Sequence, residues 1–365
     1  MNIILIILVF GVIIFFHELG HFIVAKINHI TVKEFSMGFG PKLFQFHKKE
    51  TQYTLRLIPL GGYCMMLSED DEENENDENS FEKKSIWARM AVVLAGPAMN
   101  FVIAFLFSMV IIHFCGSDPA IIGAVYNKDN IEKYQIENAE EYFNGVYPAE
   151  EAGISDGDRV LKIEGSTVKN FRELQIYLQI YGDGSPIDLT LEKEDGTVYD
   201  TTVHPAKTPD GYKIGIMSVG YQLPKNFGEL CKYSAYETRY WVKVTFLSLK
   251  LIVTRQVSSD EVSGPVGVAK NMNDTFNEAA KSSVLDLFLN WMNYIVLLSA
   301  NLGVMNLLPI PGLDGGRFIF LLIEAVTRKK VPKDKENIVT LIGFVLVMLL
   351  MVVILFNDIK NVFFH

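Results

Sequence analysis

The sequence predicts a polytopic α-helical membrane protein with four transmembrane helices and one soluble α/β domain. Three observations carry this prediction. Hydrophobic residues make up 49% of the 365 residues and gather in four runs. The long stretch between the second and third runs contains short β-rich segments. The other two connections, between the first and second runs and between the third and fourth, carry Lys and Arg near the ends of the runs, whereas the N-terminus carries none.

The four apolar runs are each long enough to cross a bilayer, which takes about 20 residues of helix. They lie at residues 3–25, 90–115, 287–308 and 338–356. A cleaved signal peptide is the alternative for the first run, but no Lys or Arg precedes it and no small-residue cleavage site follows it.

The basic residues predict the orientation in the membrane, because connections rich in Lys and Arg stay in the cytoplasm. Nine such residues lie between Lys26 and Arg89, and six between Arg317 and Lys335. We therefore expect both termini and the long segment 116–286 to lie outside the cytoplasm.

The net charge of −10 comes largely from one tract, residues 69–78, with eight carboxylates in ten positions. Like charges at this density repel one another, so the tract is expected to be a solvated loop rather than a binding site for a basic partner. The three cysteines are far apart and odd in number, which predicts neither a disulfide framework nor a zinc knuckle.

The segment 117–208 has the pattern of a mixed α/β domain. Its β-rich runs are Ile121–Tyr126, Arg159–Ile163, Ile187–Glu192 and Val198–Val203. Asp195-Gly196 predicts a hairpin between the last two, and Asn170 is a candidate N-cap for a helix.

The stretch 227–254 mixes aromatic and aliphatic residues with Lys and Arg. This pattern fits a helix on the membrane surface and equally a helix packed on the soluble domain.

The sequence HELGH at residues 17–21 is an H-E-x-x-H motif. On a helix, His17 and His21 share one face and can present their nitrogens to one metal ion. Glu18 lies beside them, where it can take a proton from a water molecule. Two neutral imidazoles, one carboxylate and an open position for water suit zinc.

The motif continues the first apolar helix, about 22 Å along it from Asn2 at about 1.5 Å per residue. Three ionisable groups on one turn at that depth are costly unless they face the bundle interior and have a partner. The alternative is that the two histidines are ordinary hydrogen-bonded residues at a helix end. That alternative does not explain why Glu18 lies beside them.

Asp314 is the candidate third ligand. It follows the third apolar run, which returns to the cytoplasmic depth of HELGH, and Pro309, Pro311 and Gly312 break the helix there. Irregular backbone at membrane depth is tolerated where it lines a cavity. The alternative is that Asp314 only caps a helix that begins at Gly315.

These motifs resemble those of the site-2 protease family of intramembrane metalloproteases, in the bacterial branch with one PDZ domain. The two signatures are HELGH and N-x-x-P-x-P-x-L-D-G at 306–315, and the resemblance covers nearly the whole chain. Further matching segments are Gly38–Pro41, Pro59–Tyr63, Ala95–Asn100 and Ser263–Gly267.

The resemblance implies His17, His21 and Asp314 as zinc ligands and Glu18 as general base. It implies that Asn306 positions the substrate or the active-site water. It also implies that residues 38–63 form a membrane-associated β-hairpin whose edge can pair with an unwound substrate strand.

Residues 147–154 and 157–165 resemble parts of a PDZ domain, with 121–125 as the candidate peptide groove. In this family the domain can instead act as a size filter. An insertion at 126–146 near the groove departs from the pattern. The expected division is a first helix pair (1–116), the PDZ domain (117–208), a membrane-surface amphipathic segment (209–286) and a second helix pair (287–365).

The predicted function is intramembrane zinc endopeptidase in the cell membrane, and its partners are the bilayer and single-span membrane proteins. The resemblance suggests anti-sigma factors or remnant signal peptides as substrates, and we expect no nucleic-acid partner. The alternatives are a tethered protease that cuts soluble proteins, a catalytically silent PDZ scaffold or chaperone, and a transporter. The placement of HELGH inside an apolar run argues against the first, and the absence of paired broken helices against the last.

Overall fold

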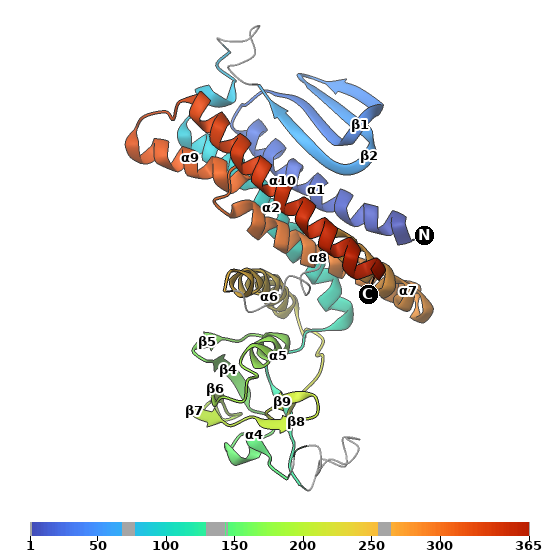
Figure 1. Cartoon of the computed structure of the whole chain (residues 1–365), viewed down its shortest axis with the longest axis vertical. Helices are drawn as coiled ribbons and strands as arrows, with labels where there is room; N and C mark the ends of the chain where they lie inside the picture. The colour runs from blue at the N-terminus through green and yellow to red at the C-terminus, as the bar shows by residue number, and fades with distance from the viewer. Residues whose placement is uncertain (1, 68–76, 129–142, 144, 255–263, 365) are drawn as a thin grey trace. The chain divides into compact units, whose positions relative to one another are not determined.

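A computed structural model describes residues 2–67, 77–128, 143, 145–254 and 264–364 (Figure 1). The chain forms two compact units, one of residues 1–108 with 241–365 and the other of residues 109–240. We call the first the helical unit and the second the soluble unit. Most of the acidic tract 69–78 and of the insertion 126–146 lies outside the described residues.

The four predicted membrane spans are confirmed as helices that are long and apolar enough to cross a bilayer. They are α1 (Asn2–Ile27), α2 (Ile86–Cys115), α8 (Val284–Leu307) and α10 (Lys333–Phe364). Two shorter helices of the same unit, α7 (Pro265–Ser282) and α9 (Asp314–Thr327), do not follow from the hydropathy pattern. A 3₁₀ turn, η1 (Phe81–Lys83), precedes α2.

The core of the helical unit joins four helices. Its buried residues come from α1, α2, α7 and α8, and they are Val9, Ile13, Ile103, Met272, Phe276 and Ile295. Helices α1 and α2 approach very closely, because a β-carbon on Gly20 would lie 2.3 Å from the carbonyl oxygen of Ala95. This contact places the HELGH turn directly against α2.

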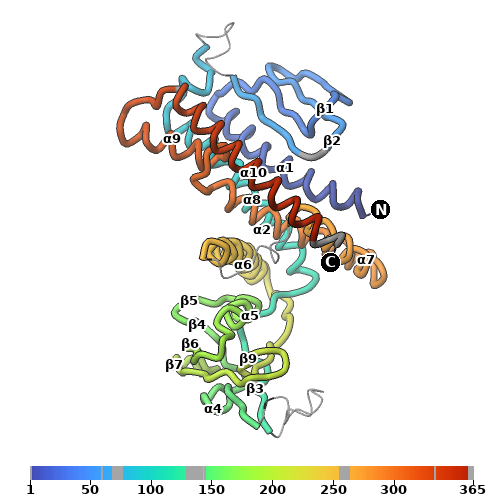
Figure 2. The backbone as a smooth tube through the Cα atoms, viewed as in Figure 1, coloured from blue at the N-terminus to red at the C-terminus, as the bar shows by residue number. Residues whose placement is uncertain are grey.

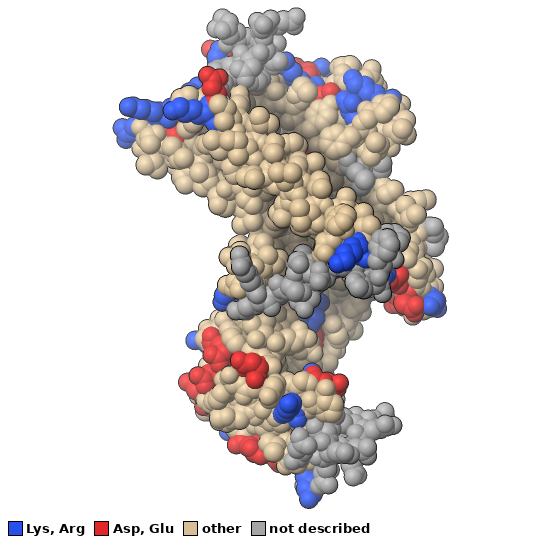
Figure 3. Space-filling model, viewed as in Figure 1, with Lys and Arg blue, Asp and Glu red and all other residues tan. Residues whose placement is uncertain are grey.

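Helix α10 has a largely apolar, exposed surface. Only 6% of the residues in its apolar window are buried, and its side appears as an unbroken tan face in Figure 3. Its exposed residues are mainly Leu, Ile, Val, Met and Phe. An apolar surface of this extent suits a lipid environment.

Two long strands, β1 (Val32–Lys48) and β2 (Thr51–Met66), form a curled antiparallel sheet beside α1 (Figure 2). The first half of β1 pairs on both sides, since Phe35 is opposite both Cys64 and Tyr53. The sheet therefore has four segments in the order 62–66, 32–37, 51–56 and 42–48, and segment 62–66 is one of its edges.

Helices α7 and α10 are joined by one buried carboxylate. Asp358 of α10 is 3% exposed. Its Oδ1 accepts a hydrogen bond from the Gly264 N–H (3.1 Å), and its Oδ2 accepts from Val266 (2.6 Å) and Gly267 (2.8 Å). These are donors that the start of a helix leaves without intrahelical partners, so α10 supplies the cap of α7.

The soluble unit is built on a four-stranded antiparallel sheet in the order β5-β4-β6-β7. The strands β4 (Arg159–Ile163), β6 (Ile187–Glu192) and β7 (Val198–Val203) lie where the sequence predicts them, and β5 is Ser166–Thr167. Smaller pairs are β3 (Ile122–Val125) with β10 (Ile216–Ser218), and β8 (Ala206–Thr208) with β9 (Gly211–Lys213). A short helix, α4 (Pro148–Glu151), precedes β4.

Helix α5 (Phe171–Ile180) covers this unit's core, and Asn170 caps it by accepting a hydrogen bond from the Glu173 N–H, as predicted. A cavity of about 680 Å³ lies beside α5. It is lined mainly by α5 and by residues 211–216. Ile121, Ile122 and Gly123 of the predicted groove line a different cavity, of about 540 Å³, and the groove itself stays a prediction.

Helix α6 (Phe227–Val253) contributes to both units. In the soluble unit its first half is ion-paired with α5, through Arg172 to Glu237 and Arg239 to Glu173. This agrees with the second alternative for the stretch 227–254, a helix packed on the soluble domain. In the helical unit, the Thr245 hydroxyl donates a hydrogen bond to Asn301 of α8.

Candidate metal centre

Helix α1 carries the HELGH turn as an unbroken part of its length, from Asn2 to Ile27. The spacing of four residues puts both histidines on one face, and their ring centroids lie 4.9 Å apart at nearly right angles. Both residues are 8% exposed. The face that they share points away from solvent and toward α2 and α9.

Asp314 reaches the histidines because the chain breaks between α8 and α9. Helix α8 ends at Leu307, the loop 308–313 contains both prolines, and Gly312 has a left-handed φ of +96°. A β-carbon on Gly315 would lie 2.1 Å from the Leu308 carbonyl oxygen, so only glycine lets the loop fold over the first turn of α9. Asp314 itself is the first residue of α9, and Leu313 occupies the N-cap position. The alternative in which Asp314 only caps the helix is therefore wrong.

The three candidate ligand atoms lie at nearly equal separations. The Oδ2 atom of Asp314 lies 3.2 Å from Nε2 of His17 and 3.4 Å from Nε2 of His21, and the two Nε2 atoms are 3.3 Å apart. Zinc–ligand bonds of about 2.0–2.1 Å in a tetrahedron require ligand atoms to be separated by about 3.3–3.4 Å. The three atoms therefore match one face of a zinc tetrahedron, and the fourth corner remains for water or substrate.

The chemistry of the donors also fits zinc. The Nδ1–H of His21 donates a hydrogen bond to the carbonyl oxygen of Val92 at 2.8 Å. That bond leaves the Nε2 lone pair of His21 directed at the cluster, in the arrangement by which metal-binding histidines are usually oriented. Two imidazoles and one carboxylate with an open fourth position are typical of catalytic rather than structural zinc sites.

Helix α2 forms the wall behind both histidines. A β-carbon on Gly96 would lie 2.3 Å from Nε2 of His21 and 2.7 Å from Cε1 of His17. Asn100, one turn further along, is fully buried and places its Nδ2 3.1 Å from Nδ1 of His17. Both residues belong to the matching segment Ala95–Asn100, but the sequence alone predicts a role for neither of them.

Glu18 and Asn306 lie at the same centre. Glu18 lines a cavity of about 590 Å³ together with His17, His21 and Asp314. Gly62 of the sheet edge sits over Glu18, since a β-carbon there would lie 3.4 Å from Glu18 Cγ. The Nδ2 of Asn306 is 3.4 Å from Nε2 of His17. The structure thus brings all five predicted site residues together.

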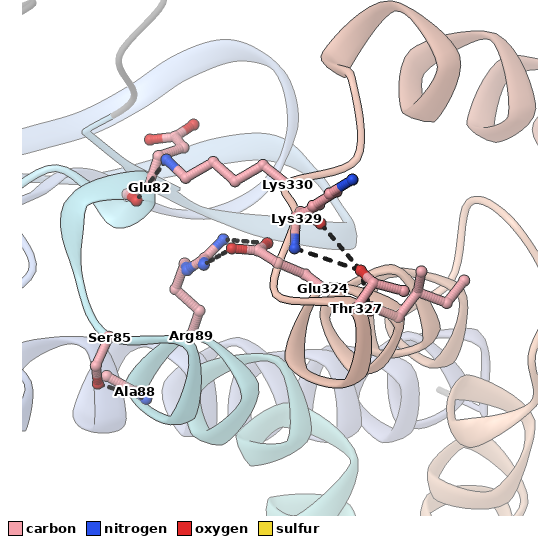
Figure 4. Close-up of polar contacts among 9 residues, drawn as sticks. Glu82, Ser85, Ala88, Arg89, Glu324, Thr327, Lys329 and Lys330 are labelled. Carbon is pink, nitrogen blue, oxygen red and sulfur yellow. Dashed lines mark hydrogen bonds and ion pairs between the residues drawn. The ribbon is translucent and has the colours of Figure 1, made fainter.

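The cavity continues away from the three ligands along the α2–α9 interface. Arg89 of α2 and Glu324 of α9 form a two-pronged ion pair there, with Nη1 to Oε2 at 3.1 Å and Nη2 to Oε1 at 2.6 Å (Figure 4). Lys330 donates to the carbonyl oxygen of Glu82 at 3.4 Å. Because Glu324 and Asp314 are on the same helix, this ion pair holds the far end of the helix that carries the third candidate ligand.

Comparison with known proteins agrees with this geometry. The profile of peptidase family M50 matches residues 5–350. The chain belongs to peptidase family M50. A Clostridium acetobutylicum protein that carries a zinc-metalloprotease name is 38% identical over 360 residues, covering 98% of this chain and 97% of that one.

Two other relatives are also matched over nearly the whole of both chains. Zinc metalloprotease RasP of Geobacillus kaustophilus is 32% identical, with 99% of this chain and 98% of the relative covered. The regulator of sigma-W protease RasP of Bacillus subtilis is 29% identical, with 98% of each covered. This M50 peptidase is accordingly a multi-pass membrane zinc metalloprotease of the site-2 protease type.

Proposed function

We propose that this M50 peptidase cleaves single-span membrane proteins within or near the bilayer, with His17, His21 and Asp314 as zinc ligands and Glu18 as general base. One observation carries the proposal: the ligand atoms of His17 and His21, on a helix long and apolar enough to cross a membrane, meet that of Asp314 from α9 at separations of 3.2–3.4 Å. A zinc site held on a membrane-spanning helix suits a substrate that is itself in the membrane.

In this proposal each side chain has a separate task. Zinc, when bound, supplies a Lewis acid that polarises the peptide carbonyl and makes water more acidic. Glu18 takes a proton from the attacking water and returns it to the leaving amine. The Asn306 amide lies 3.4 Å from Nε2 of His17, close enough to hold the substrate carbonyl or the water by a hydrogen bond.

We further propose that the substrate is presented as an added β-strand. A peptide bond in a helix is already hydrogen-bonded, so it has to unwind before attack. The edge segment 62–66 supports this role, because Tyr63, Cys64 and Met66 line the cavity that contains the candidate ligands. Strand addition there would bring a substrate backbone alongside Glu18.

For the whole chain we propose the predicted division at residues 116, 208 and 286, with a PDZ domain that binds peptide or excludes large substrates. The cavities beside α5 and beside residues 121–123 are the two candidate peptide grooves. Both termini and this domain would lie outside the cytoplasm and the zinc site toward it. Anti-sigma factors and remnant signal peptides are the proposed substrates. The name of the Bacillus subtilis relative, a regulator of sigma-W, favours the first.

Cleavage by purified protein tests the proposal. A tagged single-span substrate is incubated in detergent with wild type, with Glu18→Gln, and with wild type treated with a chelator and then with zinc. We expect cleavage by wild type, its loss on chelation and recovery with zinc. Glu18→Gln should lower the rate at least about 100-fold, the lower range for a general base, while zinc stays bound.

The control is Glu278→Gln, an exposed carboxylate on α7 that does not line the cavity. It should cleave as wild type does. Equal cleavage by wild type, Glu18→Gln and the chelated enzyme would refute the protease proposal. Binding of a membrane protein without cleavage by any of them would instead support the silent scaffold or chaperone.

A further inference from the structure

Asn100 is a buried polar side chain of the centre that has no role in the proposed chemistry. It is 0% exposed and lies on α2, one turn after Gly96. Its Nδ2 faces Nδ1 of His17 at 3.1 Å, while its Oδ1 has no hydrogen-bond partner among the described residues. A buried amide in such a place needs an explanation, since unsatisfied buried polar groups are uncommon.

The contact with His17 is inconsistent with metal binding if the amide nitrogen is the atom that faces the ring. A neutral imidazole carries one proton, and binding zinc through Nε2 requires that proton on Nδ1. The ring would then present an N–H to the amide NH₂, and two donors would face each other. The oxygen and nitrogen of an amide are nearly the same size, so their positions are assigned from such contacts.

The opposite side of the amide gives no support to the orientation with nitrogen toward the ring. The oxygen placed there has no hydrogen-bond partner among the described residues. The contact with His17 therefore decides the orientation. With oxygen toward the ring, Asn100 accepts the Nδ1–H of His17, as the Val92 carbonyl accepts that of His21.

We infer that Asn100 is a positioning residue for the metal centre, whose amide oxygen accepts the Nδ1–H of His17 and so directs Nε2 toward His21 Nε2 and Asp314. The inference rests on the proposed role of His17 as a ligand. It gives both histidines the same support from one helix: a backbone carbonyl for His21 and a side-chain amide for His17. Such outer contacts fix the tautomer and the ring orientation of a ligand.

Zinc binding tests this without relying on activity. The full-length protein in detergent is prepared as wild type, Asn100→Asp, Asn100→Leu and Asn100→Ala. Zinc per chain is measured after dialysis, and zinc affinity and release are measured against a competing chelator. The control is Ser108→Ala, which removes another fully buried polar group from α2 two turns away.

We expect Asn100→Leu and Asn100→Ala to weaken zinc binding about 10- to 100-fold, the usual cost of losing such a contact. Asn100→Asp keeps an acceptor and should bind zinc within a few-fold of wild type, as should Ser108→Ala. Because Leu and Ala differ in volume, a folding defect in one leaves the other as the test. Leu has the same number of side-chain heavy atoms as Asn and Asp but no acceptor, so a role in packing alone would not separate Asn100→Leu from Asn100→Asp.

Two results would overturn the inference: unchanged zinc binding in both apolar variants, or a loss in Asn100→Asp as large as in Asn100→Leu. Zinc binding by wild type and by His17→Ala distinguishes failure of this inference from failure of the proposed metal centre. If wild type binds no zinc, the proposed metal centre fails and the inference falls with it. If only His17→Ala loses zinc, the centre stands and Asn100 does not position it.

Discussion

Gly96 lies so close to His21 that a β-carbon on it would stand 2.3 Å from the ring Nε2. That nitrogen is a candidate zinc ligand, and it lies 3.3 Å from His17 Nε2 and 3.4 Å from Asp314 Oδ2. A shift of the ring away from a new β-carbon would therefore change the separations between the ligand atoms.

Gly96→Ala should consequently have a larger effect on the free energy of zinc binding than on the free energy of unfolding. Overpacking typically costs about 1–3 kcal/mol, which corresponds to about 5- to 150-fold in affinity if the histidines absorb it. Zinc titration against a chelator measures the effect. Gly228→Ala is the control, because its nearest neighbour is a side-chain atom at 3.2 Å. Normal zinc affinity in Gly96→Ala would contradict the close fit of α2 against the rings.

Arg89 and Glu324 should stabilise the protein only as a pair. Their side chains are 8% and 14% exposed. Arg89→Met therefore leaves the Glu324 carboxylate largely buried and unpaired, which should lower the free energy of unfolding by about 3–5 kcal/mol. Arg89→Met with Glu324→Leu removes both charges and should recover much of that loss. Thermal unfolding of the two single variants and the double variant gives the coupling between them.

Zinc content of the same variants tests whether the pair holds α9. Each single variant should also lose zinc, because Glu324 shares its helix with Asp314. Additive changes in unfolding free energy, with no coupling, would mean that the ion pair does not hold α2 and α9 together.

Asp358 should matter through its charge and its shape. Asp358→Ala leaves three backbone N–H groups at the start of α7 without their acceptor, and each buried unsatisfied group costs about 1–3 kcal/mol. Asp358→Asn keeps one oxygen and should lose less. Unfolding midpoints in detergent rank the variants, and equal stability of all three proteins would be inconsistent with the cap.

The thiol of Cys64 should be slow to react at neutral pH. Burial raises its pKa to about 12, and the nearby Glu18 carboxylate adds to the effect. The raised pKa suppresses the thiolate, the reactive form, so at pH 8 alkylation should be about three orders of magnitude slower than for an ordinary thiol of pKa about 8.5.

The rate should then rise about tenfold per pH unit until the pH approaches the pKa. Iodoacetamide labelling of a Cys115→Ser, Cys231→Ser protein across pH 7–10 measures this. Glu278→Cys, added to a protein without the native cysteines, supplies an exposed reference thiol. Equal rates for the two thiols at pH 8 would show that Cys64 is not buried beside the site.

The proposed orientation predicts opposite labelling of two surface positions. In cells, a cysteine at Lys329, between α9 and α10, should be protected from an impermeant maleimide. A cysteine at Asp195, in the β6–β7 turn, should be labelled from outside. Figure 3 shows Lys and Arg gathered at the α9–α10 end of the helical unit, which supports this orientation. Labelling of Lys329→Cys in intact cells would reverse it.

The parts that the sequence predicts correctly depend on local pattern. Hydropathy is enough for the four spans, and β-rich composition with the Asp195-Gly196 turn is enough for β4, β6 and β7. The four-residue spacing is enough for the shared face of His17 and His21. Pro309, Pro311 and Gly312 likewise predict that the helix breaks before Asp314. Each of these follows from neighbours along the chain.

The remainder depends on contacts between distant segments. The roles of Gly96 and Asn100 can be seen only when α2 is packed against α1. The residues next to them in the sequence do not distinguish them from ordinary packing residues. The pairing of β3 with β10 could not be predicted either, because strand pairing cannot be deduced from one strand and β10 lies more than 90 residues beyond β3.

Most of the soluble unit lies between two paired residues. Ser117 and Gln222 exchange two backbone hydrogen bonds, of 2.9 and 2.8 Å. A segment of about one hundred residues thus leaves and re-enters the chain through one narrow stem. Excising it and closing the stem with a short turn would keep the path of the backbone but would remove the α5 partners of Glu237 and Arg239 in α6. A domain grafted at this junction would therefore have to offer the first half of α6 a comparable acidic and basic surface.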